Sequence, residues 1–163
     1  MDNKTYIDYL NSPIGYWICK ADDNYLLSIQ YNKTRPEENP APNHLTDSAK
    51  TQLEEYFNCQ RQSFYIPMAT HKYSHFYQEV WQELIKVPYG KLSTYSDIAI
   101  HLNNPKAVRA VGMANGKNPF AIVIPCHRII GKNNSLTGYA SGLEIKKWLL
   151  QHEGSMAIQT SMF

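Results

Sequence analysis

Residues 122–130 constrain the fold of this 163-residue chain more than any other segment, because two β-branched apolar runs enclose a short polar sequence. Such runs, bounded by turn residues, are typical of buried strands or near-strand segments. Pro125 restricts the residue before it to an extended conformation and fixes the backbone that enters Cys126. We therefore predict that the Cys126 thiol is held deep in the fold, with His127 and Arg128 beside it.

A buried cysteine next to a histidine has two interpretations. It can be a small apolar core residue beside a hydrogen-bonded histidine, or it can be a nucleophile. An ordinary thiol, with a pKa of about 8.5, is mostly protonated at neutral pH. A nucleophilic Cys126 would therefore need a nearby cation, such as Arg128 or protonated His127, to favour the thiolate.

Composition limits the class of protein. Cys19, Cys59 and Cys126 are odd in number and widely spaced, so they match neither a disulfide framework nor a Cys-x-x-Cys metal site. The N-terminus is polar, and no segment reaches transmembrane length. We expect a cytoplasmic protein that makes no membrane contact, binds no metal and keeps its thiols reduced.

The charge is unevenly distributed along the chain. Residues 1–80 contain seven Lys and Arg against ten Asp and Glu, a net charge of −3. Residues 81–163 contain nine against four, a net charge of +5. The second half, which also contains Cys126, is thus the better candidate for contact with a polyanion, although ordinary scatter of charge would look similar.

Residues 1–72 are predicted to form a small structural domain with an antiparallel sheet. Strands are expected at residues 6–10, 14–20, 25–31 and, more briefly, 63–66. A helix is expected over residues 46–58, with Thr46 as its N-cap.

Residues 73–163 are predicted to be mainly helical. Helices are expected at residues 75–86, 95–102, 105–114 and 141–153. Thr94 is the expected N-cap of the second helix, Asn104 of the third and Ser141 of the fourth, and Gly154 is the expected stop. The second and third helices, joined by a tight polar turn, are typical of a helix-turn-helix.

The third of these helices carries small residues and one long arginine on its outer face. We expect Val108 and Val111 to pack inward, and Arg109, Ala110 and Met113 to face outward. Small residues let a helix approach a nucleic-acid backbone closely without reading a sequence. The alternative is that they let two helices pack closely together.

Several motifs, in order, resemble those of the O6-alkylguanine-DNA alkyltransferases, also called methylated-DNA–protein-cysteine methyltransferases. They are the helix-turn-helix with Arg109, Asn118-Pro119, Pro125-Cys126-His127-Arg128, Gly138-Tyr139 with Ser141-Gly142-Leu143, and His152-Glu153-Gly154. The resemblance covers roughly residues 76–154. It implies DNA repair by irreversible, single-turnover transfer of an alkyl group from O6-alkylguanine, and from O4-alkylthymine, to Cys126, with no cofactor.

The resemblance also implies roles for individual residues. Cys126 is the acceptor nucleophile, His127 acts as base through a water molecule, and Glu153 orients the imidazole. Residues expected to bind the substrate are Tyr95, Asn118, Tyr139, Ala140, Ser141 and Lys146. Residues expected to contact DNA are Tyr95, Ser96, Asn104, Lys106, Ala107, Arg109, Ala110, Gly112 and Met113.

The implied architecture is α+β: a ribonuclease H-like sheet domain at residues 1–72, followed by a winged-helix-like domain at residues 73–163 with the helix-turn-helix. The expected partner of this monomer is double-stranded DNA, bound through its minor groove, with the alkylated guanine flipped out of the duplex. The rival hypotheses are a helix-turn-helix DNA-binding protein or lesion sensor without chemistry, and a thiol hydrolase. A hydrolase usually places its histidine far from its cysteine in sequence, unlike the adjacent Cys126 and His127.

Overall fold

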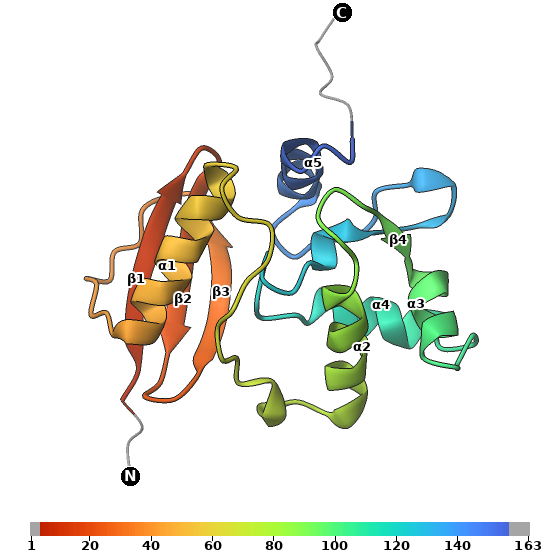
Figure 1. Cartoon of the computed structure of the whole chain (residues 1–163), viewed down its shortest axis with the longest axis horizontal. Helices are drawn as coiled ribbons and strands as arrows, with labels where there is room; N and C mark the ends of the chain where they lie inside the picture. Colours follow the sequence, from red (N-terminus) through yellow and green to blue (C-terminus); the bar gives the residue numbers. More distant parts are fainter. Residues whose placement is uncertain (1–3, 157–163) are drawn as a thin grey trace, which may run out of the picture. The chain divides into compact units, whose positions relative to one another are not determined.

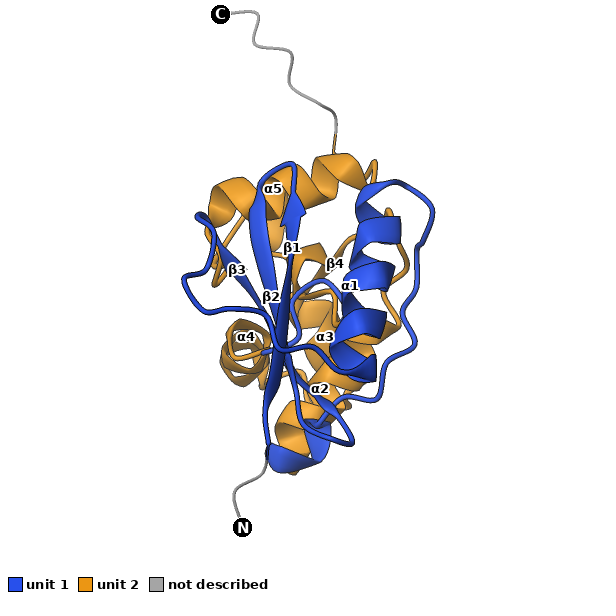
Figure 2. Ribbon diagram, turned by 90° about the vertical axis from the view of Figure 1, so that its left-hand side faces the viewer, with its two compact units in different colours: residues 1–74, 119–123 blue, residues 75–118, 124–163 orange. Residues whose placement is uncertain are grey.

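The computed structural model describes residues 4–156 (Figure 1). The chain divides into two compact units, residues 1–74 with 119–123, and residues 75–118 with 124–163 (Figure 2). Residues 119–123 thus group with the first unit, although they fall within the predicted second domain, residues 73–163. The reason is backbone pairing, since the Ile29 N–H donates to the Pro119 carbonyl at 2.8 Å and the Ala121 N–H to the Ile29 carbonyl at 3.3 Å.

The first unit is built on a three-stranded antiparallel sheet, as predicted. Strands β1 (Tyr6–Ser12), β2 (Gly15–Ala21) and β3 (Leu26–Asn32) pair in the order β1-β2-β3. Gly15 closes the first hairpin at a φ of +134°, where a side chain would collide with the Tyr31 ring. The core of this unit includes Trp17, Leu53 and Tyr56, all fully buried.

Helix α1 (His44–Phe57) packs on this sheet. Its N-cap is Asn43, so the predicted N-cap Thr46 is wrong by three residues. Asn43 accepts from two backbone N–H groups of the first turn, while the Thr46 hydroxyl accepts from the Asn43 N–H at 2.9 Å. Asparagine and threonine are both favoured N-cap residues, so the presence of Thr46 alone does not fix the start of the helix.

The strand predicted at residues 63–66 does not form. The Gln52 side chain occupies the backbone groups of Tyr65 that a strand partner would use, accepting from its N–H at 2.9 Å and donating to its carbonyl at 3.1 Å. Only Met68, beyond the predicted strand, forms an isolated bridge with Leu26. No strand pairing forms at Tyr65, because the Gln52 side chain already provides the hydrogen bonds of its backbone N–H and carbonyl.

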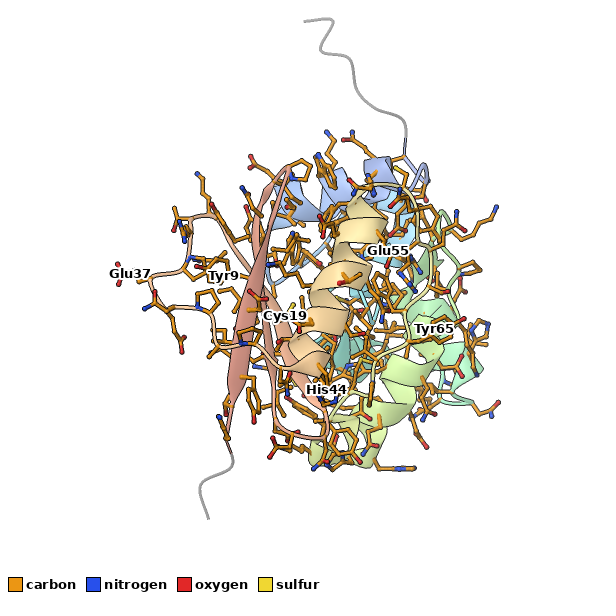
Figure 3. All side chains as sticks on the ribbon, turned by 60° about the vertical axis from the view of Figure 1, so that its left-hand side comes forward. Tyr9, Cys19, Glu37, His44, Glu55 and Tyr65 are labelled. Carbon is orange, nitrogen blue, oxygen red and sulfur yellow. The ribbon has the colours of Figure 1, made fainter. Side chains whose placement is uncertain are left out.

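Cys19 lies on the sheet beside α1, where Figure 3 labels it. It is fully buried, and burial, reinforced by Asp8, raises the pKa of its thiol to about 12. The thiol is therefore protonated at neutral pH and unreactive. Cys59 is exposed, so the three cysteines occupy three different environments.

The second unit is mainly helical, as predicted. Its helices are α2 (His75–Ile85), α3 (Tyr95–His101), α4 (Val108–Gly116) and α5 (Leu143–His152). Strands β4 (Ser93–Thr94) and β5 (Ile129–Ile130) pair in parallel. The Trp81 indole donates to the Ala114 carbonyl at 2.9 Å and so ties α2 to α4. A small antiparallel sheet plus helices agrees with the predicted α+β class.

Helices α3 and α4 are consecutive, but α4 begins later than predicted. Thr94 caps α3 as expected, accepting from the Asp97 N–H at 3.1 Å. Asn104 does not cap α4; residues 104–107 instead form a turn, closed by the Ala107 N–H donating to the Asn104 carbonyl at 3.0 Å. Asn followed by Pro suits a turn as well as a helix start, which explains the error.

Helix α5 also begins later than predicted, at Leu143 rather than near Ser141. Gly142, with a φ of +101°, stands at the N-cap, and no side chain caps the helix. Gly154 ends the turn after the helix with a φ of +78°, as predicted. Between residues 4 and 156, no helix is long and apolar enough to cross a membrane.

Candidate active site

The segment around Cys126 is buried as predicted but is not a strand. Residues 120–130 are all buried. The chain turns at residues 121–123, enters a short 3₁₀-helix at Cys126–Arg128, and becomes extended only at Ile129–Ile130. Ile122 has a φ of +71°, an unfavourable conformation for a β-branched residue. The apolar runs thus predicted the burial of the segment and its extended end at Ile129–Ile130, but not these turns.

Cys126 is 6% exposed, and this burial raises the pKa of its thiol above the ordinary value. A hydrogen bond with Asn118 and the charge of Lys146 act in the opposite direction. The Asn118 amide also donates to the Ile124 carbonyl at 2.8 Å. The resting thiol is therefore protonated, and a base is needed to form the thiolate.

His127, Arg128 and Glu153 form a buried cluster. The His127 Nε2 lies 2.6 Å from the Glu153 Oε2, and the Arg128 guanidinium donates to both carboxylate oxygens, at 2.8 and 3.2 Å. Burial would raise the pKa of Glu153, but the hydrogen bonds and charges of His127 and Arg128 hold it well below its ordinary range. Glu153 is thus ionised, which fixes the Nε2 of His127 as the protonated nitrogen.

This arrangement leaves the other imidazole nitrogen, Nδ1, as an acceptor. Within residues 4–156, the buried Nδ1 of His127 has no hydrogen-bond partner. Burial lowers the pKa of His127 below 6.5, despite the opposing effect of Glu153, so the ring is neutral at pH 7. The expectation that protonated His127 or Arg128 favours the thiolate is therefore wrong. Glu153 engages both side chains, and Lys146 is the cation that acts on Cys126.

Arg128 belongs to this site as a partner of Glu153, and not in the role of thiolate-favouring cation that was expected from the sequence. Besides its two bonds to Glu153, it donates to the Val87 carbonyl at 2.8 Å. A charged residue inside a buried apolar run was the signal, because a buried guanidinium needs an anionic partner.

A pocket of about 550 Å³ lies between α3, α4 and the loop before α5. Its lining residues are Tyr95, Val108, Gly112, Gly116, Thr137, Gly138, Tyr139 and Ala140. Of the predicted substrate residues, Tyr95, Tyr139 and Ala140 meet here. Among the described residues, Ser141 does not line this pocket, and Thr137 was missed. The Thr137 hydroxyl donates to the Tyr95 hydroxyl at 3.1 Å and joins the loop to α3.

Tyr139 links this pocket to the reactive cluster. Tyr139 lines the pocket, while its hydroxyl is buried and, within the described residues, has no hydrogen-bond partner. Burial is the main cause that raises its pKa well above 10, and the ionised Glu153 and, once it forms, the Cys126 thiolate act in the same direction. The Tyr139 hydroxyl thus remains protonated and can donate a hydrogen bond.

Lys146 fastens the loop that carries Tyr139. Its ammonium group is fully buried and donates to the Ile129 carbonyl at 2.6 Å and to the Thr137 carbonyl at 2.8 Å. Burial lowers its pKa to about 8. One side chain on α5 therefore connects strand β5 to the pocket loop and places a positive charge near the thiol.

The outer face of α4 and the turn before it are exposed. Arg109, Ala110 and Met113 face solvent, as predicted, whereas Val111 is buried and Val108 lines the pocket. Of the other residues predicted to contact DNA, Asn104 and Lys106 are exposed, while Ser96, Ala107 and Gly112 are partly exposed. Because α4 begins late, Asn104, Lys106 and Ala107 lie in the preceding turn rather than in the helix.

Proteins of known identity resemble this chain closely. A family model described as "6-O-methylguanine DNA methyltransferase, DNA binding domain" matches residues 75–155. The methylated-DNA–protein-cysteine methyltransferase of Methanosarcina acetivorans is 42% identical over 155 residues, covering 92% of this chain and 99% of that protein. The protein of the same name from Haemophilus influenzae is 43% identical over 154 residues, covering 91% and 86%.

Solved structures agree with the sequence comparisons. The crystal structure of Mycobacterium tuberculosis O6-methylguanine methyltransferase has a TM-score of 0.80 at 34% identity, covering 95% of this chain and 96% of that chain. The structure of the Mycobacterium tuberculosis protein in complex with DNA has a TM-score of 0.78 at 35% identity, covering 90% and 91%. The matches span nearly the full length of both partners, and this chain therefore belongs to the methylated-DNA–protein-cysteine methyltransferase family.

Proposed function

We propose that this protein repairs DNA by direct damage reversal, transferring the alkyl group of O6-alkylguanine, and of O4-alkylthymine, to Cys126. The observation that carries the proposal is the buried Cys126 next to a neutral His127, whose Nε2 is held by Glu153 and whose Nδ1 is a ready acceptor. Membership of the family supports the same reaction. No cofactor is needed, because the chain supplies both the acceptor and the base.

The transfer is a single displacement. His127, acting through a water molecule, takes the thiol proton, and the Cys126 sulfur attacks the saturated alkyl carbon. The bond between that carbon and O6 breaks, its electron pair stays on guanine, and guanine takes up one proton. The product is a thioether, whose C–S bond is stable to water, so each molecule reacts once. Glu153 acts as a positioning residue, since its carboxylate holds the imidazole in the required tautomer.

We propose the following path for the substrate. The exposed face of α4 enters the minor groove of double-stranded DNA, and Arg109 fills the stack that the flipped guanine leaves. Ser96, Asn104, Lys106, Ala107, Ala110, Gly112 and Met113 contact the DNA around it. The base enters the pocket lined by Tyr95, Tyr139 and Ala140, and Ser141 follows in the same loop, which Lys146 fastens. Asn118 ties α4 to the reactive segment.

The remaining proposals concern the whole protein. We assign a monomer with a cytoplasmic location and access to DNA. The first unit has a structural role and a ribonuclease H-like fold, and the second is winged-helix-like. A three-stranded antiparallel sheet with a packed helix supports the first assignment, and consecutive helices α3 and α4 beside a small parallel sheet support the second.

The test is intact mass with peptide mapping after mixing the protein with a duplex that carries one O6-methylguanine. We expect one added methyl group per molecule, located on Cys126 and saturating at that level. Cys126→Ser is the control and should remain unmodified, although Cys19 and the exposed Cys59 are still present. Unmodified Cys126 with tight lesion binding would instead indicate a lesion sensor, and repeated turnover would contradict the single-use mechanism.

A further inference from the structure

Asn115 is a buried amide on the inner face of α4. The residue is only 3% exposed, and its Nδ2 donates to the carbonyl of Cys126 at 3.4 Å. Three residues further, the amide of Asn118 donates to the Ile124 carbonyl at 2.8 Å. Two amides at one end of α4 therefore bind two carbonyls of the reactive segment, one of them on the nucleophilic residue itself.

The helix that carries Asn115 is firmly held in its unit. Val111 and Ala114 are fully buried, and the Ala114 carbonyl accepts from the Trp81 indole on α2. The opposite face of α4, with Arg109 and Met113, is exposed. Asn115 thus connects the inside of a rigid helix to Cys126, while the outside of the same helix is free to contact a ligand.

The reactive segment has an irregular backbone that needs support. Cys126 follows a proline and is the first residue of a short 3₁₀-helix. Its N–H donates to the Ile124 carbonyl at 2.8 Å, and its carbonyl accepts from the Ile129 N–H as well as from Asn115. No continuous strand or long helix holds it in place. An irregular backbone keeps one conformation when side chains around it specify that conformation. Asn115 and Asn118 supply such contacts on either side of the Cys126 peptide.

The second polar atom of Asn115 indicates why an amide stands at this position. Within residues 4–156, its buried Oδ1 has no hydrogen-bond partner. An unpaired buried acceptor is destabilising, and an apolar residue of similar size would avoid it. The bond from Nδ2 to the Cys126 carbonyl is the contact that an apolar residue cannot replace. Its 3.4 Å length suits a bond that tightens when the reactive complex forms.

We infer that Asn115 is a positioning residue for alkyl transfer, which couples α4 to the nucleophile by holding the Cys126 carbonyl. The inference rests on the proposed function. It concerns the rate of the chemical step and not the binding of DNA, since Asn115 is on the inner face of the helix. It also differs from a purely structural role, because packing alone would not require a donor at this atom.

The test measures the single-turnover rate of methyl transfer against lesion-duplex concentration, which separates the saturating rate from the apparent Kd. Wild-type protein is measured first, and its failure to transfer would refute the proposed function before any variant is used. Asn115→Leu removes the donor at similar volume. Leu84→Ala is the matched control, because it removes a fully buried contact in α2 and destabilises the same unit.

We expect Asn115→Leu to lower the saturating rate by about tenfold or more, since a small displacement of a reacting group is costly. Its apparent Kd should change little. Leu84→Ala should lower the melting temperature and leave the saturating rate of the folded protein unchanged. A wild-type saturating rate in Asn115→Leu, or an equal loss of rate in Leu84→Ala, would overturn the inference.

Asn115→Asp provides a rescue that a structural role would not produce. An ionised carboxylate repels the Cys126 carbonyl, whereas a protonated carboxyl group can donate to it, and burial favours the protonated form. We expect the rate of Asn115→Asp, divided by the wild-type rate, to rise as the pH falls. The division cancels the titration of the neighbouring His127, Tyr139, Lys146 and Glu153. A ratio that does not rise with acidity would contradict the donor role.

Discussion

At the scale of single residues, the site is a set of buried charges that balance one another. Glu153 is the centre of this set, because it accepts hydrogen bonds from His127 and, through two oxygens, from Arg128. With Glu153 ionised and Arg128 positively charged, the imidazole can remain neutral and act as a base. We therefore expect stability and reactivity to depend on the same carboxylate.

The change Glu153→Gln should test this dependence. It leaves the buried Arg128 without an anion, so we expect a loss of about 3–5 kcal/mol in the free energy of unfolding at pH 7. Transfer should also slow, because the tautomer of His127 is no longer imposed. Denaturant unfolding and single-turnover kinetics measure the two effects. Glu144→Gln, an exposed acid at the start of α5, is the control and should change neither.

The same variant has a predictable pH dependence. The pKa of Glu153 is lowered from its ordinary value of 4.5 in the folded protein, so its contribution to stability is fully present above that value. The contribution is lost as the pH falls, because the unfolded chain binds the proton first. The difference in stability between wild type and Glu153→Gln should therefore shrink below pH 4.5. A constant difference would contradict the assignment.

At the scale of elements, α5 holds the loop of residues 131–142 in place through a hydrogen bond. Lys146 reaches from the helix to the Thr137 carbonyl in that loop and to the Ile129 carbonyl in β5. The loop in turn contacts α3 through the hydrogen bond between Thr137 and Tyr95. One wall of the pocket is thus a loop whose position is fixed at Thr137 by hydrogen bonds to two helices, α3 and α5.

We expect Lys146→Met to slow transfer by about tenfold or more, because the loop is released and Cys126 loses its nearby cation. The pKa of Lys146 is lowered from 10.5 to about 8, so the folded protein releases this proton before the unfolded chain does. Wild-type stability relative to Lys146→Met should therefore increase as the pH rises from about 8 towards 10.5. Kinetics and denaturant unfolding provide the measurements, with Lys147→Met as the control.

At the scale of the whole molecule, the two halves of the sequence differ in the sign of their net charge. Residues 1–80 carry a net charge of −3 and residues 81–163 carry +5. A net charge of only +2 for the whole protein predicts weak general attraction to DNA, so we expect binding to come from particular cations in the second half. Lys106 in the turn before α4 is one such exposed cation.

Binding to undamaged duplex should weaken as salt increases, because cations that contact phosphates release counterions. We expect Lys106→Ala to reduce the slope of log affinity against log salt concentration by about one. Lys33→Ala, an exposed cation in the acidic half, should leave the slope unchanged. Fluorescence anisotropy over a series of salt concentrations measures both. Equal slopes in all three proteins would exclude Lys106 from the interface.

Much of this molecule follows from local sequence signals. The three strands of the sheet, helix α2, the Thr94 cap and the stop at Gly154 were all predicted, because alternation, helical spacing, capping side chains and glycine act over a few residues. The burial of Cys126 followed from the apolar runs around it. The motif sequences also predicted the family, which the comparisons confirmed.

The tertiary structure decided which of several locally acceptable options was used. Asn104 and Pro105 suit either a helix start or a turn, and the fold uses the turn. The strand predicted around Tyr65 does not form, because the side chain of Gln52, 13 residues away, is hydrogen-bonded to the backbone N–H and carbonyl of Tyr65. The thiolate-favouring cation is Lys146 and not Arg128, because Glu153 lies 25 residues after Arg128 and binds it. Hydrogen bonds and charges between distant residues depend on the folded positions of both partners, and no local pattern encodes those positions.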